Sequence, residues 1–206
     1  MRILIAGFGP FPGAPFNPSA LLTAALARKR RPALTEIEIE SHIFATAYTA
    51  VDRDLRRLLA RKPDALLIFG LAASRPHVCV ETRAPNAVSL LSPDASGRRP
   101  RRATIDKSKP PSRTGNTPFA YLLSALRRSG VSAHLSRDAG RYLCNYAYWR
   151  ALQHVEGKRP LVQFVHIPRI ATKERRRKLN RRRPSLAKLT AAAENLLSAL
   201  VAASRR

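Results

Sequence analysis

The chain contains little cysteine, few acidic residues and no long hydrophobic run. Its two cysteines, Cys79 and Cys144, are too few for the disulfide framework of a small secreted domain. No uninterrupted apolar run reaches the roughly 20 residues that a membrane-spanning helix needs. The apolar stretch that follows Met1 is broken at once by Gly7 and Gly9, which favours a first strand over a signal peptide. We therefore expect a cytoplasmic protein with reduced thiols and no membrane partner.

The shortage of acidic residues leaves a large positive charge. Lys and Arg number 38 against 13 Asp and Glu, a formal net charge of +25. Such a surplus attracts polyanions, nucleic acid above all. The basic residues cluster in residues 28–31, 98–102 and 175–183, and runs of like charge are usually solvated loops. We expect these segments to bind nucleic acid non-specifically. Repulsion between such copies also opposes a homo-oligomer.

Hydrophobic periodicity predicts strands that alternate with helices. We expect strands near residues 2–6, 36–44, 64–70, 131–135 and 161–166 and helices near 51–59, 117–128 and 144–154. Two more helices are expected to begin at Asn17-Pro18, with an apolar face through Ala25, and at Pro184-Ser185, with an apolar face through Leu200. This alternation predicts an α/β fold: one domain, residues 1–206, built on an open, twisted, mostly parallel sheet with helices on both faces. Residues 92–115 are polar, basic and aperiodic, which is typical of a functional or mobile loop. A second basic segment, residues 172–184, is expected to be a linker before the last helix.

Three side chains have the chemistry of a thiol hydrolase. Cys144 is expected at a helix N-terminus, where the dipole favours a thiolate and free amides can bind an oxyanion. His166, near the end of a strand, can take the thiol proton and return it to a leaving amine. Glu81 is the best candidate to orient the imidazole. Each residue alone also fits a structural role, as a core cysteine, a core histidine or a surface charge. Cys79 is expected to be buried and inert.

Four sequence blocks give these residues a family context. In chain order they are Gly7-Phe-Gly-Pro-Phe-Pro-Gly13 with the following Asn17-Pro-Ser19, then Glu81-Thr-Arg-Ala-Pro-Asn86, Ala139-Gly-Arg-Tyr-Leu-Cys-Asn145 and Phe164-Val-His-Ile-Pro168. Together they resemble the pyroglutamyl peptidase I family of cysteine peptidases, also called pyrrolidone-carboxylate peptidases. The resemblance runs from the first strand to the last helix.

The resemblance implies a cysteine exopeptidase that removes N-terminal pyroglutamate through an acyl-enzyme. It implies Cys144 as nucleophile, His166 as base and Glu81 as the carboxylate that orients it, with no cofactor and no metal. Pyroglutamate is a neutral lactam without a free amine, so its pocket should be apolar with a few amide partners. The expected walls of that pocket are Phe8, Phe11, Leu71 and Leu143.

Several positions depart from the family pattern. Leu71 follows Gly70 where the family commonly has glutamine, Pro12 stiffens the first turn, and Thr82 replaces an arginine. The basic loop 92–115 also matches poorly. These departures keep two alternatives open: a divergent member that acts on another N-terminal amide, and a non-catalytic protein that binds polyanions through its basic surface. The family often forms homo-oligomers, so the oligomeric state is also open.

Overall fold

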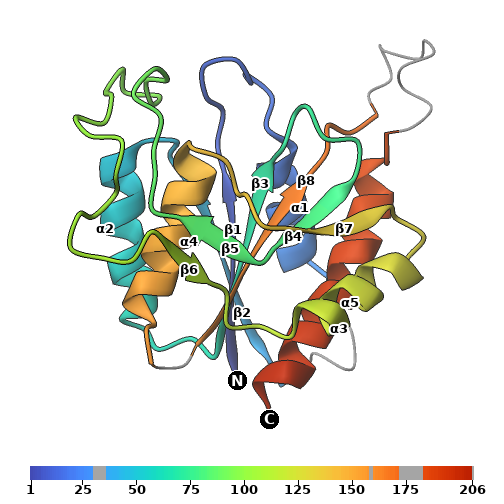
Figure 1. The fold of residues 1–206 in the computed structure, drawn as a ribbon. Coiled ribbons are helices and arrows are strands. Elements are labelled where there is room, and N and C mark those ends of the chain that lie inside the picture. Colours follow the sequence, from blue (N-terminus) through green and yellow to red (C-terminus); the bar gives the residue numbers. More distant parts are fainter. Residues whose placement is uncertain (30–35, 158–159, 172–182, 206) are drawn as a thin grey trace.

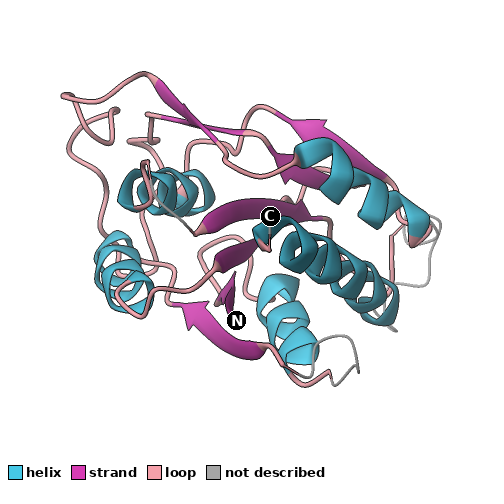
Figure 2. Cartoon of the chain, turned by 90° about the horizontal axis from the view of Figure 1, so that it is seen from below, coloured by secondary structure: helices cyan, strands magenta, loops and turns pink. Residues whose placement is uncertain are grey.

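The strands and helices of this chain form three layers, with one sheet between two groups of helices (Figures 1 and 2). The computed structural model describes residues 1–29, 36–157, 160–171 and 183–205. Its six-stranded sheet has the order β2-β1-β3-β8-β4-β7. The strands are β1 (Arg2–Phe8), β2 (Glu38–Phe44), β3 (Ala65–Leu71), β4 (Val78–Glu81), β7 (Ala133–Ser136) and β8 (Leu161–Ile167). Each lies within about three residues of its expected bounds, apart from β4, for which no bounds were predicted.

The sheet is mostly parallel, as predicted. Strands β2, β1, β3 and β8 pair in parallel, β4 pairs antiparallel with β8, and β7 runs parallel to β4. Helices α2 (Tyr48–Leu59) and α4 (Leu143–His154) contact each other on one face, and α5 (Leu186–Ser204) contacts α1 (Pro18–Ala27) and α3 (Phe119–Arg128) on the other. The predicted α/β fold with helices on both faces is therefore confirmed.

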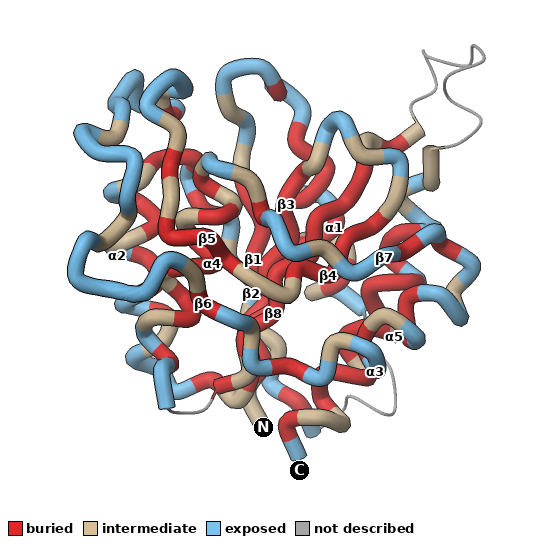
Figure 3. The backbone as a smooth tube through the Cα atoms, in the orientation of Figure 1, coloured by how far each residue is buried: buried red, intermediate tan, exposed pale blue. Residues whose placement is uncertain are grey.

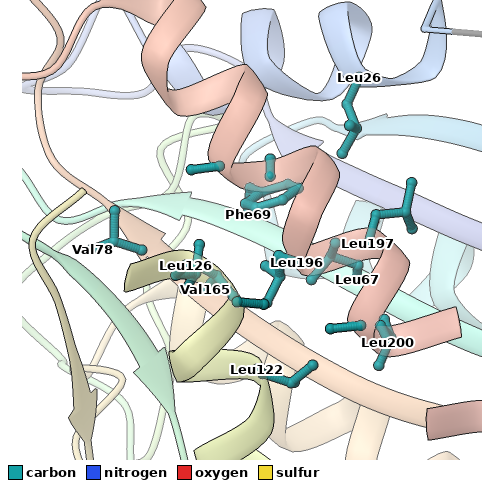
Figure 4. Packing of buried hydrophobic residues seen from close by; sticks show 14 of the residues in the cluster. Leu26, Leu67, Phe69, Val78, Leu122, Leu126, Val165, Leu196, Leu197 and Leu200 are labelled. Carbon is teal, nitrogen blue, oxygen red and sulfur yellow. The ribbon is translucent and has the colours of Figure 1, made fainter. Parts of the chain in front are cut away.

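The core is divided between the two faces by the alternation of side chains along the strands. Ile3 and Ile5 of β1 face α1 and α5, whereas Leu4 and Ala6 face α2 and α4. Figure 4 shows the first of these clusters, in which side chains of β3 and β8 pack against α5 and α3. Burial on both faces explains why the central strands read as continuous apolar runs.

Helix α5 qualifies the expectation that no uninterrupted apolar run is long enough to span a membrane. Its 19 residues are long and apolar enough by length and composition, although Lys188 and Glu194 interrupt the apolar run. The helix packs against α1, α3 and β3, and 56% of its apolar window is buried within the molecule. Its apolar surface is thus part of the core of this fold. Ser185 caps its first turn by accepting a hydrogen bond from the Lys188 amide at 3.1 Å.

Buried side chains fix the long basic loop near its two ends. At one end, Asp94 is 1% exposed and its carboxylate accepts hydrogen bonds from the backbone amides of Tyr48, Ser96 and Arg98. At the other, the Asn86 amide donates to three carbonyl oxygens, those of Asp106, Lys109 and Pro110. The loop ends in β6 (Ser112–Thr114), which pairs with β5 (Arg83–Pro85).

The fold brings several segments to one edge of the sheet. Strands β1, β3 and β8 end there, helix α4 begins there, and exposed loops surround that edge (Figures 1 and 3). The open edge of a parallel α/β sheet at the carboxyl ends of its strands is the usual position of a ligand site. Most of the predicted basic linker, residues 172–182, lies outside the described residues.

Candidate active site

The register of β4 against β8 brings Glu81 and His166 together. Cys79 lies opposite His166 and Glu81 lies opposite Phe164, so Glu81 and His166 are diagonal neighbours on the face that α4 covers. The His166 Nδ1 atom lies 2.8 Å from Oε1 of Glu81. Glu81 is completely buried and His166 is 5% exposed. The carboxylate can therefore hold the ring in one orientation, with Nε2 as the second ring nitrogen.

Cys144 is the second residue of α4, and its side chain lines the same hollow as the His166 imidazole. The preceding N-cap residue, Tyr142, offers its hydroxyl to the Pro93 carbonyl at 2.8 Å, and no side chain caps the helix. The amides of the first turn therefore remain available at the thiol. Cys144 is partly exposed, whereas Cys79 is 1% exposed. Both cysteines are free, and Cys79 is buried as expected.

The groups around His166 shift its pKa. Burial lowers the pKa of the imidazole, but its interactions with Cys144 and Glu81 outweigh burial and raise the pKa to about 9. Hydrogen bonds to the charged form have this effect because they stabilise the imidazolium. The site can therefore keep a proton on the ring beside a sulfur nucleophile.

Arg75 also binds Glu81, and the sequence did not predict it as a site residue. Its Nη1 atom donates to Oε1 of Glu81 at 2.9 Å and to the Ser136 hydroxyl at 3.1 Å, and Nη2 donates to the Asp138 carbonyl at 2.9 Å. A single carboxylate oxygen thus contacts both the arginine and His166. No local pattern marks Arg75, because its partners lie on two segments far from each other in the sequence, the end of β4 and the end of β7.

A hollow of about 320 Å³ lies next to the thiol and the imidazole. The four residues expected as its walls, Phe8, Phe11, Leu71 and Leu143, all line it together with Cys144 and His166. Phe8 and Leu143 are almost fully buried, at 2% and 1% exposure, so they form its inner walls.

Two polar residues of this hollow were not expected as site residues. Asn17 and Thr46 both line it, and each donates a hydrogen bond to the Gly9 carbonyl, at 3.0 and 3.1 Å. Asn17 is also the N-cap of α1, since its Oδ1 accepts from the Ser19 amide at 3.1 Å.

Close packing holds the reacting groups in place. A Cβ added at Gly70 would lie 2.9 Å from the Cys144 sulfur and 2.7 Å from the Phe164 ring, so only glycine fits there. The Asn145 amide donates to the carbonyls of Pro85 and Ala87, both at 2.8 Å, which ties the start of α4 to the segment after Glu81. The position of the thiol thus depends on three separate parts of the chain.

Other parts of the described chain lack this combination of groups. A larger hollow of about 660 Å³, at the far end of α4, is lined by Arg113, Leu152 and Glu156 among others and contains no cysteine or histidine. Among residues 1–29, 36–157, 160–171 and 183–205, no group of three or more His, Cys, Asp or Glu could hold a metal ion. The arrangement suits covalent catalysis by a thiol, with His166 as the proton carrier.

Comparison with known proteins gives one consistent result. The sequence profile of the family described as pyroglutamyl peptidase matches residues 1–206. A pyrrolidone-carboxylate peptidase of Thermococcus kodakarensis is 30% identical over 171 residues, which cover 82% of this chain and 81% of that one. The corresponding protein of Thermococcus onnurineus is 30% identical over 190 residues, 91% of each chain.

Solved structures agree in fold. A mutant pyrrolidone carboxyl peptidase of Pyrococcus furiosus superposes with a TM-score of 0.87 at 23% identity, covering 99% of this chain and 100% of that one. The enzyme of Thermococcus litoralis gives a TM-score of 0.85 at 24% identity, covering 98% of this chain and 93% of the other.

Proposed function

Because this chain belongs to the pyroglutamyl peptidase family of cysteine peptidases, we propose that it removes N-terminal pyroglutamate from peptides. The observation that carries the proposal is the placement of Cys144, His166 and Glu81 beside a hollow with apolar walls. The substrate would be a peptide whose first residue is a lactam, and the products would be free pyroglutamate and a peptide shortened by one residue.

In the first half of the reaction, the Cys144 sulfur attacks the pyroglutamyl carbonyl carbon. The carbonyl oxygen becomes an oxyanion, and the uncapped amides at the start of α4 are positioned to stabilise it. His166 then donates its proton to the peptide nitrogen, the carbon–nitrogen bond breaks, and the shortened peptide leaves as an amine. The pyroglutamyl group remains on Cys144 as a thioester.

In the second half, a water molecule hydrolyses the thioester. Neutral His166 takes a proton from the water while the water oxygen attacks the acyl carbon. The carbon–sulfur bond then breaks, pyroglutamate leaves as a carboxylic acid, and the imidazolium and sulfur are restored. Glu81 holds the imidazole in the orientation that both halves require, and it stabilises the positive ring that forms.

The hollow fits the first residue of such a substrate. Its apolar walls, Phe8, Phe11, Leu71 and Leu143, suit the methylene groups of a five-membered lactam ring. The ring carries no charge, so the site needs only a few polar groups to orient the lactam amide. Asn17 and Thr46, which line the same hollow, are the best placed for this role.

The test is the release of a fluorescent amine from a pyroglutamyl-aminocoumarin reporter under reducing conditions. We expect turnover by the parent protein, none by Cys144→Ala, and normal turnover by the matched control Cys79→Ala. Iodoacetamide should label Cys144 and spare the buried Cys79. Turnover by the Cys144→Ala variant, or none by the parent, would refute the proposal.

Leu71 favours a second candidate: hydrolysis of a different N-terminal amide. This apolar residue lines the hollow at a position where the related family carries a side-chain amide, so the polar contacts of the lactam would change. A panel of acetyl, formyl, prolyl and pyroglutamyl reporters separates the two candidates. Preferential cleavage of one of the other groups would assign the enzyme to that substrate.

A further inference from the structure

A second hollow, of about 310 Å³, has a charged wall that the proposed reaction does not use. One side of it consists of the exposed side chains of Arg98, Arg99, Arg101 and Arg102, which we call the arginine wall. The other side is aromatic and apolar: Tyr48, Tyr146, Val88 and Ile105. Such a site suits a ligand that has an acidic group and an apolar or extended remainder.

The positive charge of the arginine wall is not neutralised within the described structure. None of its four guanidinium groups forms an ion pair or a side-chain hydrogen bond with a residue that the structure describes. The nearest acidic residues in the sequence are Asp94 and Asp106, and their carboxylates bind backbone amides. Asp94 accepts from the Ser96 amide and Asp106 from the Ser108 amide. The wall is therefore free to bind an external carboxylate.

The arginine wall is held against the body of the molecule. Asp94 accepts the Arg98 amide at 2.9 Å and the Tyr48 amide at 3.1 Å, and the Ala95 amide donates to the Thr46 carbonyl at 2.8 Å. Residues 94–98 are thus attached to the N-terminus of α2. A fixed wall binds with a smaller loss of conformational entropy than a flexible arginine tail would.

The second hollow adjoins the catalytic hollow. Tyr142 lines the catalytic hollow and Tyr48 lines the second, and their rings meet edge to face with centroids 6.4 Å apart. The two hollows are therefore neighbours that meet at this ring contact. An extended peptide spans about 3.3 Å per residue, so one whose first residue occupies the catalytic hollow can continue into the second hollow.

We propose that the arginine wall binds acidic side chains a few positions after the pyroglutamyl residue, so that acidic peptides are the preferred substrates. This inference rests on the proposed pyroglutamyl peptidase activity and names the substrate class of that same site. Guanidinium groups bind carboxylates through paired hydrogen bonds, which suits glutamate and aspartate side chains. A hollow with an aromatic side that adjoins the catalytic hollow favours a peptide over a nucleic acid.

The test compares three peptides that differ only at the third and fourth residues. They are pyroglutamyl-Ala-Glu-Glu-Ala-amide, its Gln-Gln analogue and its Lys-Lys analogue, with the aminocoumarin reporter as a substrate that lacks these positions. At low salt we expect kcat/KM for the acidic peptide to exceed that of the Gln-Gln peptide about fivefold, because exposed ion pairs are individually weak. The Lys-Lys peptide should be the poorest, and the differences should shrink at high salt.

Two variants show whether the arginine wall is responsible. Replacing its four arginines by glutamine should remove the acidic preference and leave reporter cleavage unchanged. A matched control loses the same charge at exposed helix ends that line neither hollow, and it should keep the preference. The control substitutions are Arg56→Gln, Arg57→Gln, Arg127→Gln and Arg128→Gln.

Each outcome separates this inference from the proposed activity. Equal cleavage of the three peptides by a protein that cleaves the reporter would overturn the arginine wall as a substrate site and leave the activity intact. Loss of the preference in the control as well would assign it to the overall charge of the molecule and also overturn the inference.

If neither the reporter nor the peptides are cleaved, the affinities of the three peptides test the inference instead. Labelled peptides titrated into the Cys144→Ala variant should still bind in the order acidic, neutral, basic. Equal binding of the three peptides would refute the inference. So would a result in which replacing the four arginines weakens the binding of a DNA oligonucleotide but not the binding of the acidic peptide.

Discussion

Glu81 binds the imidazole of His166 and the guanidinium of Arg75 through the same carboxylate oxygen, at 2.8 and 2.9 Å. Its other oxygen, Oε2, is buried and has no hydrogen-bond partner among the described residues. A buried carboxylate is stable only when it is paired. The two partners therefore fix both the charge and the direction of Glu81, and through it the orientation of His166.

The variant Glu81→Gln should retain the shape of the site and lose most of its activity. The amide cannot stabilise a positive imidazole, so we expect kcat/KM to fall on the order of 10³-fold. The pKa of His166 should also fall, because the bond to Glu81 is among the causes that raise it. Reporter kinetics and NMR titration of the imidazole measure both effects, and near-normal turnover would exclude Glu81 as the orienting group.

Stability should decrease as the pH rises from about 6.5 to about 9. The pKa of His166 is raised from 6.5 to about 9 in the folded protein. The folded state therefore binds more protons than the unfolded state in this range, so the contribution is complete below 6.5 and lost as the pH rises through 9. The loss is at most about 3 kcal/mol, at about 1.4 kcal/mol per pKa unit.

Urea unfolding at pH 6 and pH 9.5 measures this loss. The variant His166→Gln should show a smaller difference between the two pH values, because it has no imidazole to titrate. An equal difference in both proteins would mean that other groups cause it.

Gly70→Ala should displace Cys144 or Phe164, because Gly70 lies on β3 directly against both side chains. The added methyl group would meet the Cys144 sulfur and the Phe164 ring at distances that real Cβ atoms do not show, so one of them must move. We expect a loss of about 1–3 kcal/mol in unfolding free energy, as in other overpacked cores, and a fall in kcat. Gly9→Ala is the matched control, since its Cβ would meet only the Phe44 carbonyl, at 3.6 Å. Similar kinetics for the two variants would contradict this account.

Arg75→Ala should lower kcat more than it raises KM, because the guanidinium bonds directly to the Glu81 oxygen that contacts His166. Arg75→Lys should restore part of the activity, since a lysine keeps the charge but not the forked contacts to Ser136 and Asp138. Arg83→Ala serves as the control, because that side chain makes a single bond to the Arg137 carbonyl. A change confined to KM would assign Arg75 to substrate binding instead.

Asp94→Ala should release the segment that carries the arginine wall. The carboxylate accepts several amide hydrogen bonds, and bonds to a charged acceptor contribute about 1.5–3 kcal/mol each. Trypsin should then cut after Arg98, Arg101 and Arg102 about tenfold faster, because local opening limits proteolysis of a folded chain. Asp106→Ala, which removes a similar bond to the Ser108 amide, should leave that rate unchanged. Equal rates in the two variants would show that Asp94 does not hold the segment.

Local sequence patterns predicted most of the fold. The buried strands read as apolar runs, the Asn17-Pro18 and Pro184-Ser185 pairs marked helix starts, and their alternation indicated the parallel sheet. A helix as long and apolar as α5 was not anticipated, because Lys188 and Glu194 interrupt its apolar pattern in the sequence. The antiparallel pairing of β4 was not predicted either, since strand direction follows from the path of the chain and not from its local composition.

The sequence by itself determined the types of reactive residue and the family: one cysteine at a helix start, one histidine near a strand end and one acidic residue, in blocks shared with a known family. Only the tertiary structure decided how they meet. Diagonal pairing on β4 and β8 placed Glu81 against His166, and Arg75 joined them from a loop with no pattern of its own. The arginine wall likewise became a site only where the fold set it beside Tyr48. Periodicity is a property of neighbours along the chain, whereas a site consists of residues that become neighbours only on folding.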